Sequence, residues 1–171
     1  MDHFIQAQGQ IWLPHIMRRL ANRFADACDT VFPAFGITVP PGMVSTVHLL
    51  FDRGPRSVTD IAAVTHQSHP LINKYVQRLK GLGLVETRAD PKDGRRTIVT
   101  LTREGERQAT LLLDARPSFN AAYARLMLEA DADIFDALWR IEDALEKTPF
   151  ADRIMAERGT EADGEPEAGV R

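Results

Sequence analysis

The sequence predicts a mainly α-helical protein with one small β-hairpin. Apolar residues recur at helical spacing along most of the chain. Two short β-branched segments, 84–88 and 97–101, enclose a turn-rich loop, which is typical of a hairpin. The chain has 171 residues, of which 44% are hydrophobic and 26% charged, so it is long enough and apolar enough to bury a globular core.

The first predicted helix ends near Val31. Its apolar residues follow one another at steps of three, four and seven: Ile5, Trp12, Ile16, Leu20, Phe24, Ala27 and Val31. Because Pro14 interrupts this pattern, the regular helix begins near Leu13 or is kinked there. Pro33, Gly36 and Pro40-Pro41 then break the helix.

A second helix is predicted from Pro41 to about Asp52, and a third follows it closely. The second helix is expected to bury Val44, Val47, Leu50 and Phe51. The segment Ser57-Val58-Thr59-Asp60 has the pattern of a capping box, with a hydroxyl at the cap and a carboxylate three residues later. It therefore predicts a short third helix that ends near His66.

The fourth predicted helix has an N-terminal cap, a buried stripe and a glycine stop. Ser68 is the expected cap, and Pro70 lies in the first turn, where its missing N–H is harmless. Gly81 and Gly83 end the helix. The buried stripe is expected to consist of Ile72, Val76 and Leu79.

After the hairpin, two further helices and a tail are predicted. One helix starts at about Thr102 and runs to about Met127, with a bend expected at Pro117. Asp131 to Asp133 interrupt it. The last helix has apolar residues spaced as in a coiled-coil seam, namely Ile134, Leu138, Ile141 and Leu145. From Gly159 the chain lacks apolar periodicity, so we expect a flexible acidic tail.

Two short helices joined by a tight turn and followed by a hairpin form a winged helix-turn-helix. With its apolar stripe inward, the fourth helix turns His69, Asn73, Lys74 and Gln77 outward. Asn and Gln side chains form paired hydrogen bonds with adenine, and Lys binds guanine or phosphate. The hairpin loop adds Lys92, Arg95 and Arg96, which suit an adjacent minor groove. The pattern therefore predicts binding to double-stranded DNA.

The charge distribution agrees with this prediction although the net charge is −3. Residues 68–103 contain eight basic and three acidic side chains, a local balance of +5. Residues 104–171 contain eight basic and sixteen acidic side chains, a balance of −8. Because nucleic acid responds to the local field, the positive middle segment is the part that matters.

The stretch from Ser57 to Gly105 resembles the multiple-antibiotic-resistance regulator (MarR) family of bacterial transcription factors. The motifs that carry the resemblance are the helix 68–79, Gly83-Leu84-Val85, the loop 90–96 and Leu101-Thr102-Arg103-Glu104-Gly105. The resemblance implies that Asp93 and Arg95 brace the wing and that Arg95 enters the minor groove. The basic residue often found between them is Gly94 here, so the loop is expected to be more flexible, with Arg96 compensating.

The resemblance also implies a homodimer formed by the first and last helices, which acts as a repressor on a pseudo-palindromic operator. The predicted regions are an N-terminal dimerisation helix at 1–36, a DNA-binding lobe at 37–103, C-terminal dimerisation helices at 104–158 and a tail at 159–171. The expected DNA-binding residues are Ser68, His69, Pro70, Asn73, Lys74, Gln77, Arg78, Lys92, Asp93, Arg95 and Arg96. The expected dimerisation residues are Ile16, Leu20, Ile134, Leu138, Ile141 and Leu145.

The remaining candidate residues are one cysteine, two histidines and six aromatic residues. Cys28 is interpreted as a packed small side chain rather than a redox sensor, because Asp26 and Asp29 beside it disfavour a thiolate. His66 and His69 have no accompanying ligand cluster, so no metal is expected. Aromatic residues interpreted mainly as core leave open a pocket for a small apolar or aromatic effector: Trp12, Phe32, Phe35, Phe51, Tyr123 and Trp139.

The function classes that remain are a DNA-binding regulator and, as the alternative, a winged-helix protein-interaction module. No nucleophile-base pair, phosphate loop or paired-carboxylate motif was found, so neither an enzyme nor a cofactor is expected. The single cysteine, the absence of a signal-peptide pattern and the lack of an apolar run of about 20 residues predict a cytoplasmic protein without membrane attachment.

Overall fold

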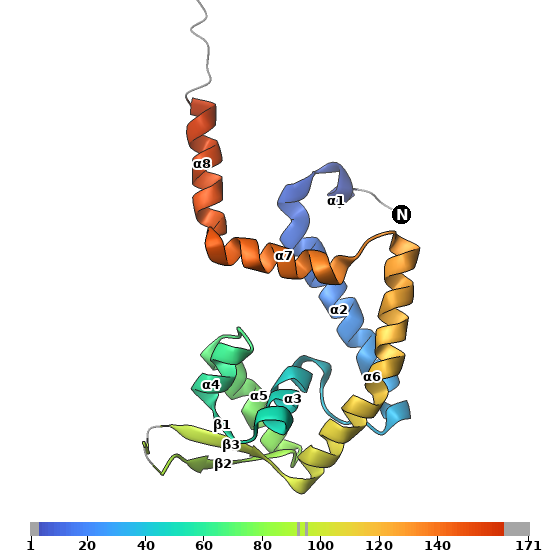
Figure 1. Cartoon of the computed structure of the whole chain (residues 1–171), viewed down its shortest axis with the longest axis vertical. Helices are drawn as coiled ribbons and strands as arrows, with labels where there is room; N and C mark the ends of the chain where they lie inside the picture. Colours follow the sequence, from blue (N-terminus) through green and yellow to red (C-terminus); the bar gives the residue numbers. More distant parts are fainter. Residues whose placement is uncertain (1–3, 92, 95, 163–171) are drawn as a thin grey trace, which may run out of the picture. The chain divides into compact units, whose positions relative to one another are not determined.

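The computed structural model describes residues 4–91, 93–94 and 96–162. These residues are mostly helical and contain one small antiparallel sheet, which confirms the predicted fold class (Figure 1). The chain divides into two compact units, Met1–Pro117 and Ser118–Arg171. Each unit is described by itself, and helix α6 (Arg103–Ala130) contributes residues to both.

The first unit contains the winged helix-turn-helix. Its elements, in chain order and before α6, are α1 (Phe4–Ala7), η1 (Gln10–Trp12), α2 (Leu13–Val31), η2 (Phe32–Phe35), η3 (Pro41–Met43), α3 (Val44–Arg53), β1 (Arg56–Ser57), α4 (Val58–Val64), α5 (His69–Gly81), β2 (Val85–Ala89) and β3 (Thr97–Leu101). The strand order is β1-β3-β2, and both pairings are antiparallel. The predicted hairpin is therefore present, and β1 adds a third strand that the sequence pattern did not indicate.

Local capping explains where α4 and α5 begin. Ser57 Oγ accepts the N–H of Asp60, and the Asp60 carboxylate accepts the N–H of Ser57, which completes the predicted capping box. Ser68 Oγ accepts the N–H of Leu71 at the start of α5. Between the two helices, His66 has a φ of 51°, so the connecting turn contains a left-handed residue that is not glycine. The tight turn brings α5 across α4.

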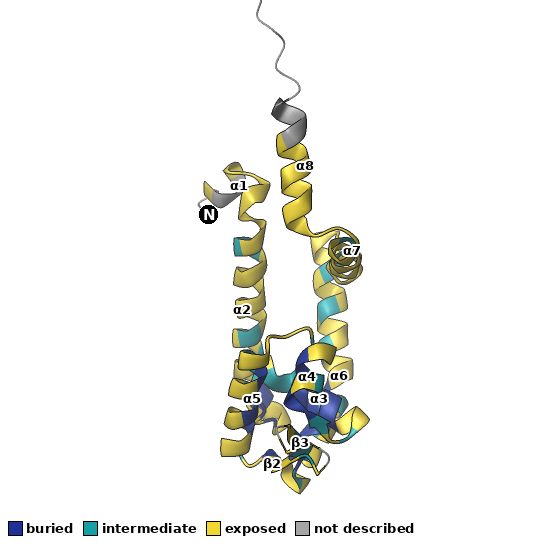
Figure 2. Ribbon diagram, turned by 90° about the vertical axis from the view of Figure 1, so that its left-hand side faces the viewer, coloured by how far each residue is buried: buried dark blue, intermediate teal, exposed yellow. Residues whose placement is uncertain are grey.

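The hydrophobic core of the first unit lies among α3, α4, α5, the sheet and the start of α6 (Figure 2). Ile72, Val76 and Leu79 are buried as predicted. The expectation that Phe51 is buried is wrong, because its exposed fraction is 41%. The buried face of α3 is formed by Thr46, Val47, Leu49 and Leu50. Phe51 lies at the edge of that face.

Helix α2 begins at Leu13, which is one of the two alternatives that Pro14 left open, and buries none of its residues within this chain. Large apolar side chains on it remain accessible, among them Met17, Leu20 and Phe24. In Figure 2 nearly the whole of α2 is coloured as exposed. A 19-residue helix with an uncovered apolar stripe is typical of a surface that another molecule covers.

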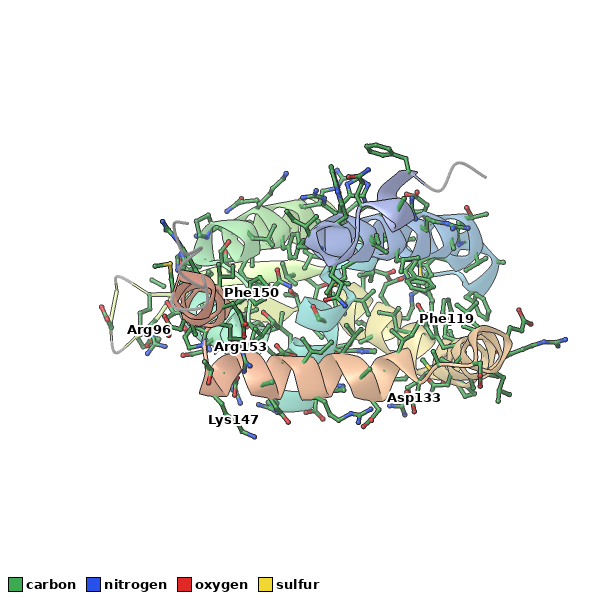
Figure 3. All side chains as sticks on the ribbon, turned by 90° about the horizontal axis from the view of Figure 1, so that it is seen from above. Arg96, Phe119, Asp133, Lys147, Phe150 and Arg153 are labelled. Carbon is green, nitrogen blue, oxygen red and sulfur yellow. The ribbon has the colours of Figure 1, made fainter. Side chains whose placement is uncertain are left out.

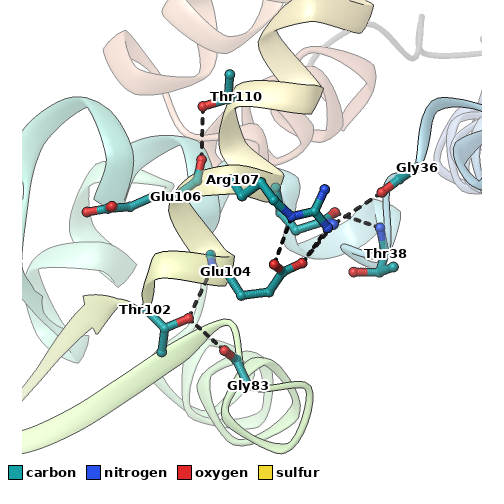
Figure 4. Close-up of polar contacts among 10 residues, drawn as sticks. Gly36, Thr38, Gly83, Thr102, Glu104, Glu106, Arg107 and Thr110 are labelled. Atoms are coloured by element: carbon teal, nitrogen blue, oxygen red, sulfur yellow. Dashed lines mark hydrogen bonds and ion pairs between the residues drawn. The ribbon is translucent and has the colours of Figure 1, made fainter.

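The start of α6 is attached to the rest of the first unit by the polar contacts drawn in Figure 4 and by one close backbone approach. The fully buried Gln108 accepts the N–H of Thr38 and donates to the carbonyl of Gly36. Gly105 lies directly against the backbone carbonyl of Leu84, where a β-carbon has no room. Pro117 lies inside α6, as predicted, and the helix continues through it.

The second unit comprises the end of α6, α7 (Ile134–Lys147) and α8 (Phe150–Ala162). Asp133 caps the N-terminus of α7, and Lys147 is the last residue of this helix. Both residues are labelled in Figure 3. Arg153 of α8 donates to the carbonyls of Ala144 and Thr148 and so caps the other end of α7. Helix α8 was not predicted from the sequence as a separate helix.

The described part of α7 presents a continuous apolar face. Ile134, Leu138, Ile141 and Leu145 are each more than 40% exposed and recur at the spacing of a helical seam. No helix of the described residues is long and apolar enough to cross a membrane. Helix α8 extends to Ala162, so the first four residues of the predicted tail, 159–162, are helical. Residues 163–171, the rest of that tail, lie outside the described residues, and for them the tail stays a prediction.

Candidate nucleic-acid interface

Helix α5 presents a polar face away from the core. Its apolar stripe is inserted between α4 and the sheet, so the opposite side of the helix is accessible. The residues predicted to contact DNA on this helix are all exposed, namely Ser68, His69, Pro70, Asn73, Lys74, Gln77 and Arg78. The face therefore combines hydrogen-bonding amides with cations and lacks large apolar side chains.

Two of these residues are bonded to each other. The side-chain amide of Asn73 donates to Nδ1 of His69 over 3.0 Å, one helical turn apart. The bond holds the amide plane in one orientation and leaves the amide oxygen available to an outside donor. Both residues were predicted to contact DNA, but their pairing was not predicted, although their spacing of four along a helix makes the contact possible.

The wing is anchored at its base by main-chain hydrogen bonds. In the hairpin, Val85 pairs with Leu101 and Ala89 with Thr97. Beyond the paired strands, the N–H of Asp90 donates to the carbonyl of Arg96, and the N–H of Arg96 donates to the carbonyl of Asp93. Lys92 and Arg95, two of the predicted wing residues, lie outside the described residues.

Arg96 has a different environment from the one expected of a DNA-facing wing residue. Its Nη2 donates to Ser57 Oγ over 2.8 Å and lies 2.9 Å from both carboxylate oxygens of Asp60. Figure 3 labels Arg96 beside the loop of the hairpin. The pKa of Asp60 is lowered, chiefly by hydrogen bonding with Ser57 and further by the neighbouring Arg96 charge.

Cations continue from α5 onto the hairpin. Lys74, Arg78 and Lys80 are exposed on α5, and Arg88 is exposed on β2. Lys80 also donates to the hydroxyl of Thr87 over 3.2 Å, which joins the end of α5 to the hairpin. The exposed basic residues thus extend over both elements that a winged helix presents to a duplex.

The remaining candidate groups are the Cys28 thiol, the metal-ligating residue types and the aromatic residues. The pKa of the half-buried Cys28 thiol is raised, first by burial and then by the charge of Asp29, so the unreactive thiol is the favoured form. Among the residues that the structure describes, no three His, Cys, Asp or Glu side chains gather as a metal site would need. Among the aromatic residues interpreted mainly as core, Phe32 is buried, but Trp12, Phe35, Phe51 and Trp139 are exposed, so the core interpretation is wrong for these four.

A groove of about 710 Å³ lies in the first unit, next to the end of α2. Its lining is mainly apolar and includes Phe32, Ile37, Val39 and Met43. One acidic residue, Asp29, and one basic residue, Arg78, also line the groove. Arg78 belongs to α5, so the groove touches the helix that carries the polar face.

The comparisons with known proteins match this architecture. Residues 44–96, from α3 to the wing, match the model of the MarR family. No curated protein sequence matches the chain. The resemblance to the MarR family stated above is confirmed for this part of the chain.

Solved structures extend the likeness over most of the chain. A probable transcriptional regulator from Pseudomonas aeruginosa is 27% identical, with 79% of this chain and 98% of that chain covered and a TM-score of 0.62. The PcaV transcriptional regulator from Streptomyces coelicolor, solved with its natural ligand, is 25% identical over 77% of this chain and 92% of its own, with a TM-score of 0.63. Reduced AbfR bound to DNA shares the fold at 20% identity, with 85% and 98% covered and a TM-score of 0.62.

Proposed function

We propose that this protein is a sequence-specific DNA-binding transcriptional regulator that acts as a homodimer and represses the genes it binds. The observation that carries the proposal is the composition of the exposed face of α5. It places Asn73, Lys74 and Gln77 side by side on a helix that has the position of a recognition helix. A winged helix that binds proteins would be expected to expose apolar residues there.

Each part of the proposed interface has its own role. Asn73 and Gln77 form base-specific hydrogen bonds in the major groove, where their amides match adenine. Ser68, His69, Pro70, Lys74 and Arg78 lie around them and contact phosphate or the groove edge. In the wing, Lys92, Asp93 and Arg95 belong to the proposed site, with Arg95 in or beside the minor groove. Arg96 lies beside them but bonds to Ser57 and Asp60.

The homodimer is proposed because both units expose apolar helix faces. Ile16 and Leu20 lie on α2, and Ile134, Leu138, Ile141 and Leu145 lie on α7. Exposed apolar stripes of this length are uncommon on monomers. A two-fold dimer presents two copies of α5 about 34–36 Å apart, one turn of the double helix, so the operator is pseudo-palindromic.

An effector is a further part of the proposal, and the groove beside α2 is its proposed site. Its apolar lining suits a small apolar or aromatic molecule, and Asp29 and Arg78 supply polar anchors. PcaV, to which the chain is similar, was solved with a natural ligand. An effector changes DNA binding only if it prefers one arrangement of the two recognition helices over another. The proposed regulator works in the cytoplasm, where its DNA is.

The deciding experiment is footprinting of the full-length protein on the DNA upstream of its own gene, followed by titration of the protected site against random duplex. The proposal predicts a protected pseudo-palindrome and tighter binding to it than to random DNA, with affinity for both falling as salt rises. Arg95→Ala should weaken binding to both duplexes and reduce the salt slope by about one unit. A protein that binds no duplex at low salt is instead the protein-interaction module.

A further inference from the structure

Arg96 makes hydrogen bonds with both its backbone and its side chain. Its N–H and carbonyl bond to Asp93 and Asp90, each over 2.9 Å, and close the base of the wing loop. Its guanidinium leaves the wing and bonds to Ser57 and Asp60. One residue therefore connects the wing loop to the start of α4.

The acceptors of this guanidinium are themselves held in place. Ser57 is 1% exposed, and it pairs with Ile98 in the sheet. Its hydroxyl also accepts the N–H of Asp60, so the hydroxyl serves the helix cap and Arg96 together. Asp60 Oδ2 accepts the N–H of Ser57 over 3.3 Å and the Nη2 of Arg96 over 2.9 Å. The capping box is thus extended into a three-residue cluster.

The contact between Arg96 and Asp60 joins residues that are far apart in the sequence. Arg96 and Asp60 are 36 positions apart. Four further ion pairs of the described chain join residues within four positions of each other. Near Arg96, the backbone link between the hairpin and the helices is strand β1, which pairs with β3 and has two residues. A side-chain link therefore strengthens the attachment of the hairpin at this point.

We infer that Arg96 is a positioning residue, which holds the wing against the N-terminus of α4, and that it is not one of the residues that bind the DNA backbone. This inference rests on the proposed DNA-binding function. The guanidinium faces a carboxylate at 2.9 Å, so the pair carries no net charge toward a duplex. If Arg96 bound phosphate instead, it would leave the Asp60 carboxylate uncompensated beside the DNA, which is electrostatically unfavourable.

The two roles predict opposite effects of Asp60→Asn on DNA affinity. The asparagine keeps an oxygen for the N–H of Ser57, so the helix cap survives, but the ion pair is lost. If Arg96 positions the wing, affinity for the protected site falls by about two- to fivefold, the range expected of an exposed ion pair, although a negative charge has been removed. If Arg96 binds phosphate, the freed guanidinium and the lost carboxylate raise the affinity.

Arg96→Ala and the double variant complete the test. With a positioning role, Asp60→Asn combined with Arg96→Ala weakens binding no more than Arg96→Ala alone, because both changes break one link. Arg88→Ala is the matched control for the cycle, since it removes an exposed arginine from the hairpin without touching Ser57 or Asp60, so its loss of affinity should add in full to that of Asp60→Asn. Additive losses in the double variant would overturn the inference.

A readout without DNA separates this inference from the proposed function. Amide hydrogen exchange at Thr97 and Ile98 should be about two- to fivefold faster in Asp60→Asn and Arg96→Ala than in the wild type and Arg88→Ala. Unchanged exchange in both variants would show that Arg96 does not hold the wing. If exchange accelerates as expected while the wild type binds no duplex, the positioning role stands and the DNA-binding function fails.

Discussion

Asn73 and His69 are hydrogen-bonded on the exposed face of α5, the amide nitrogen of one lying 3.0 Å from Nδ1 of the other. An exposed side-chain amide that rotates freely can exchange the positions of its N–H donor and its C=O acceptor. When the Asn73 amide is bonded to His69, its donor and acceptor have fixed positions, which is the property that a base-reading side chain needs. The pair therefore connects a local contact on one helix to the selectivity proposed for the whole protein.

The first prediction concerns this selectivity. Asn73→Ala should weaken binding to the protected site by about 1–3 kcal/mol and change binding to random duplex little, because base contacts are lost and phosphate contacts remain. Gln77→Ala should behave in the same way. His69→Ala should relax discrimination less than Asn73→Ala, because the amide stays but is no longer held. Fluorescence anisotropy titrations with both duplexes measure these effects.

Lys74→Ala is the control for that set. A lysine that binds phosphate contributes equally on any sequence, so its loss should weaken binding to both duplexes by the same factor. If Asn73→Ala likewise weakens both duplexes equally, the amide does not discriminate bases, and the assignment of α5 to base readout is wrong.

The second prediction concerns Gln108, which joins α6 to the chain before α3. Its amide satisfies the Thr38 N–H over 2.7 Å and the Gly36 carbonyl over 3.1 Å, and the side chain is fully buried. Gln108→Ala leaves both backbone groups without this partner, so the free energy of unfolding should fall by about 1–3 kcal/mol. Chemical denaturation followed by circular dichroism measures the loss. Thr110→Ala, on an exposed position of the same helix, should change stability by less than about 0.5 kcal/mol.

The third prediction is a pH dependence centred on Glu104. Hydrogen bonds from Arg107 and then Gln108, together with the Arg107 charge, lower the pKa of Glu104 from 4.5 to about 2. Because the folded-state pKa lies below the unfolded one, the stabilisation is complete above pH 4.5 and is lost as the pH falls toward 2. An NMR titration of the carboxyl should give the low value in the wild type and a higher one in Arg107→Ala. Titration near 4.5 in the wild type would contradict the contact.

The fourth prediction compares two glycines. Gly105→Ala places a β-carbon against the Leu84 carbonyl, so α6 and the strand must separate, and stability should fall by about 1–3 kcal/mol. Gly81, at the end of α5, has open space around the same position. Gly81→Ala should therefore be neutral or stabilise by up to about 1 kcal/mol. Thermal unfolding of both variants provides the comparison, and equal destabilisation would speak against the close approach.

The parts of the fold that the sequence predicted are those in which neighbouring residues determine the structure. The capping box at Ser57 and Asp60, the glycine stop at Gly83 and the buried stripe of α5 all depend on residues within one or two turns. The strands of the hairpin were found because the turn residues between them are local. The same reasoning identified the outward amides Asn73 and Gln77, since the outer face follows once the inner one is known.

The contacts that the sequence did not predict join distant residues. Gln108 bonds to Thr38 across 70 positions, and Arg96 bonds to Asp60 across 36. Nothing in the local pattern of Arg96 distinguishes a wing cation that faces DNA from one that faces α4. Strand β1 has two residues, which is too short to give a periodic signal. Only the folded arrangement brings these groups together.

The last prediction tests the homodimer through α7. Leu138 and Ile141 lie on its apolar face and are 42% and 46% exposed in the single chain. A charge at either position would have to be buried without a partner in the proposed interface, which opposes association strongly. Leu138→Lys and Ile141→Lys should therefore convert the dimer to monomers or aggregates. Light scattering should show the wild type at twice the chain mass of 19.1 kDa.

Asp143→Lys is the matched control, because residue 143 is exposed on the opposite side of α7 from that apolar face. It adds the same lysine to the same helix and should leave the dimer intact. Variants that lose the dimer should also lose most of their affinity for the pseudo-palindrome, since two recognition helices would no longer be linked. If Leu138→Lys and Ile141→Lys both remain dimers of unchanged mass, α7 is not the dimerisation surface, and α2 or another face of the chain must supply it.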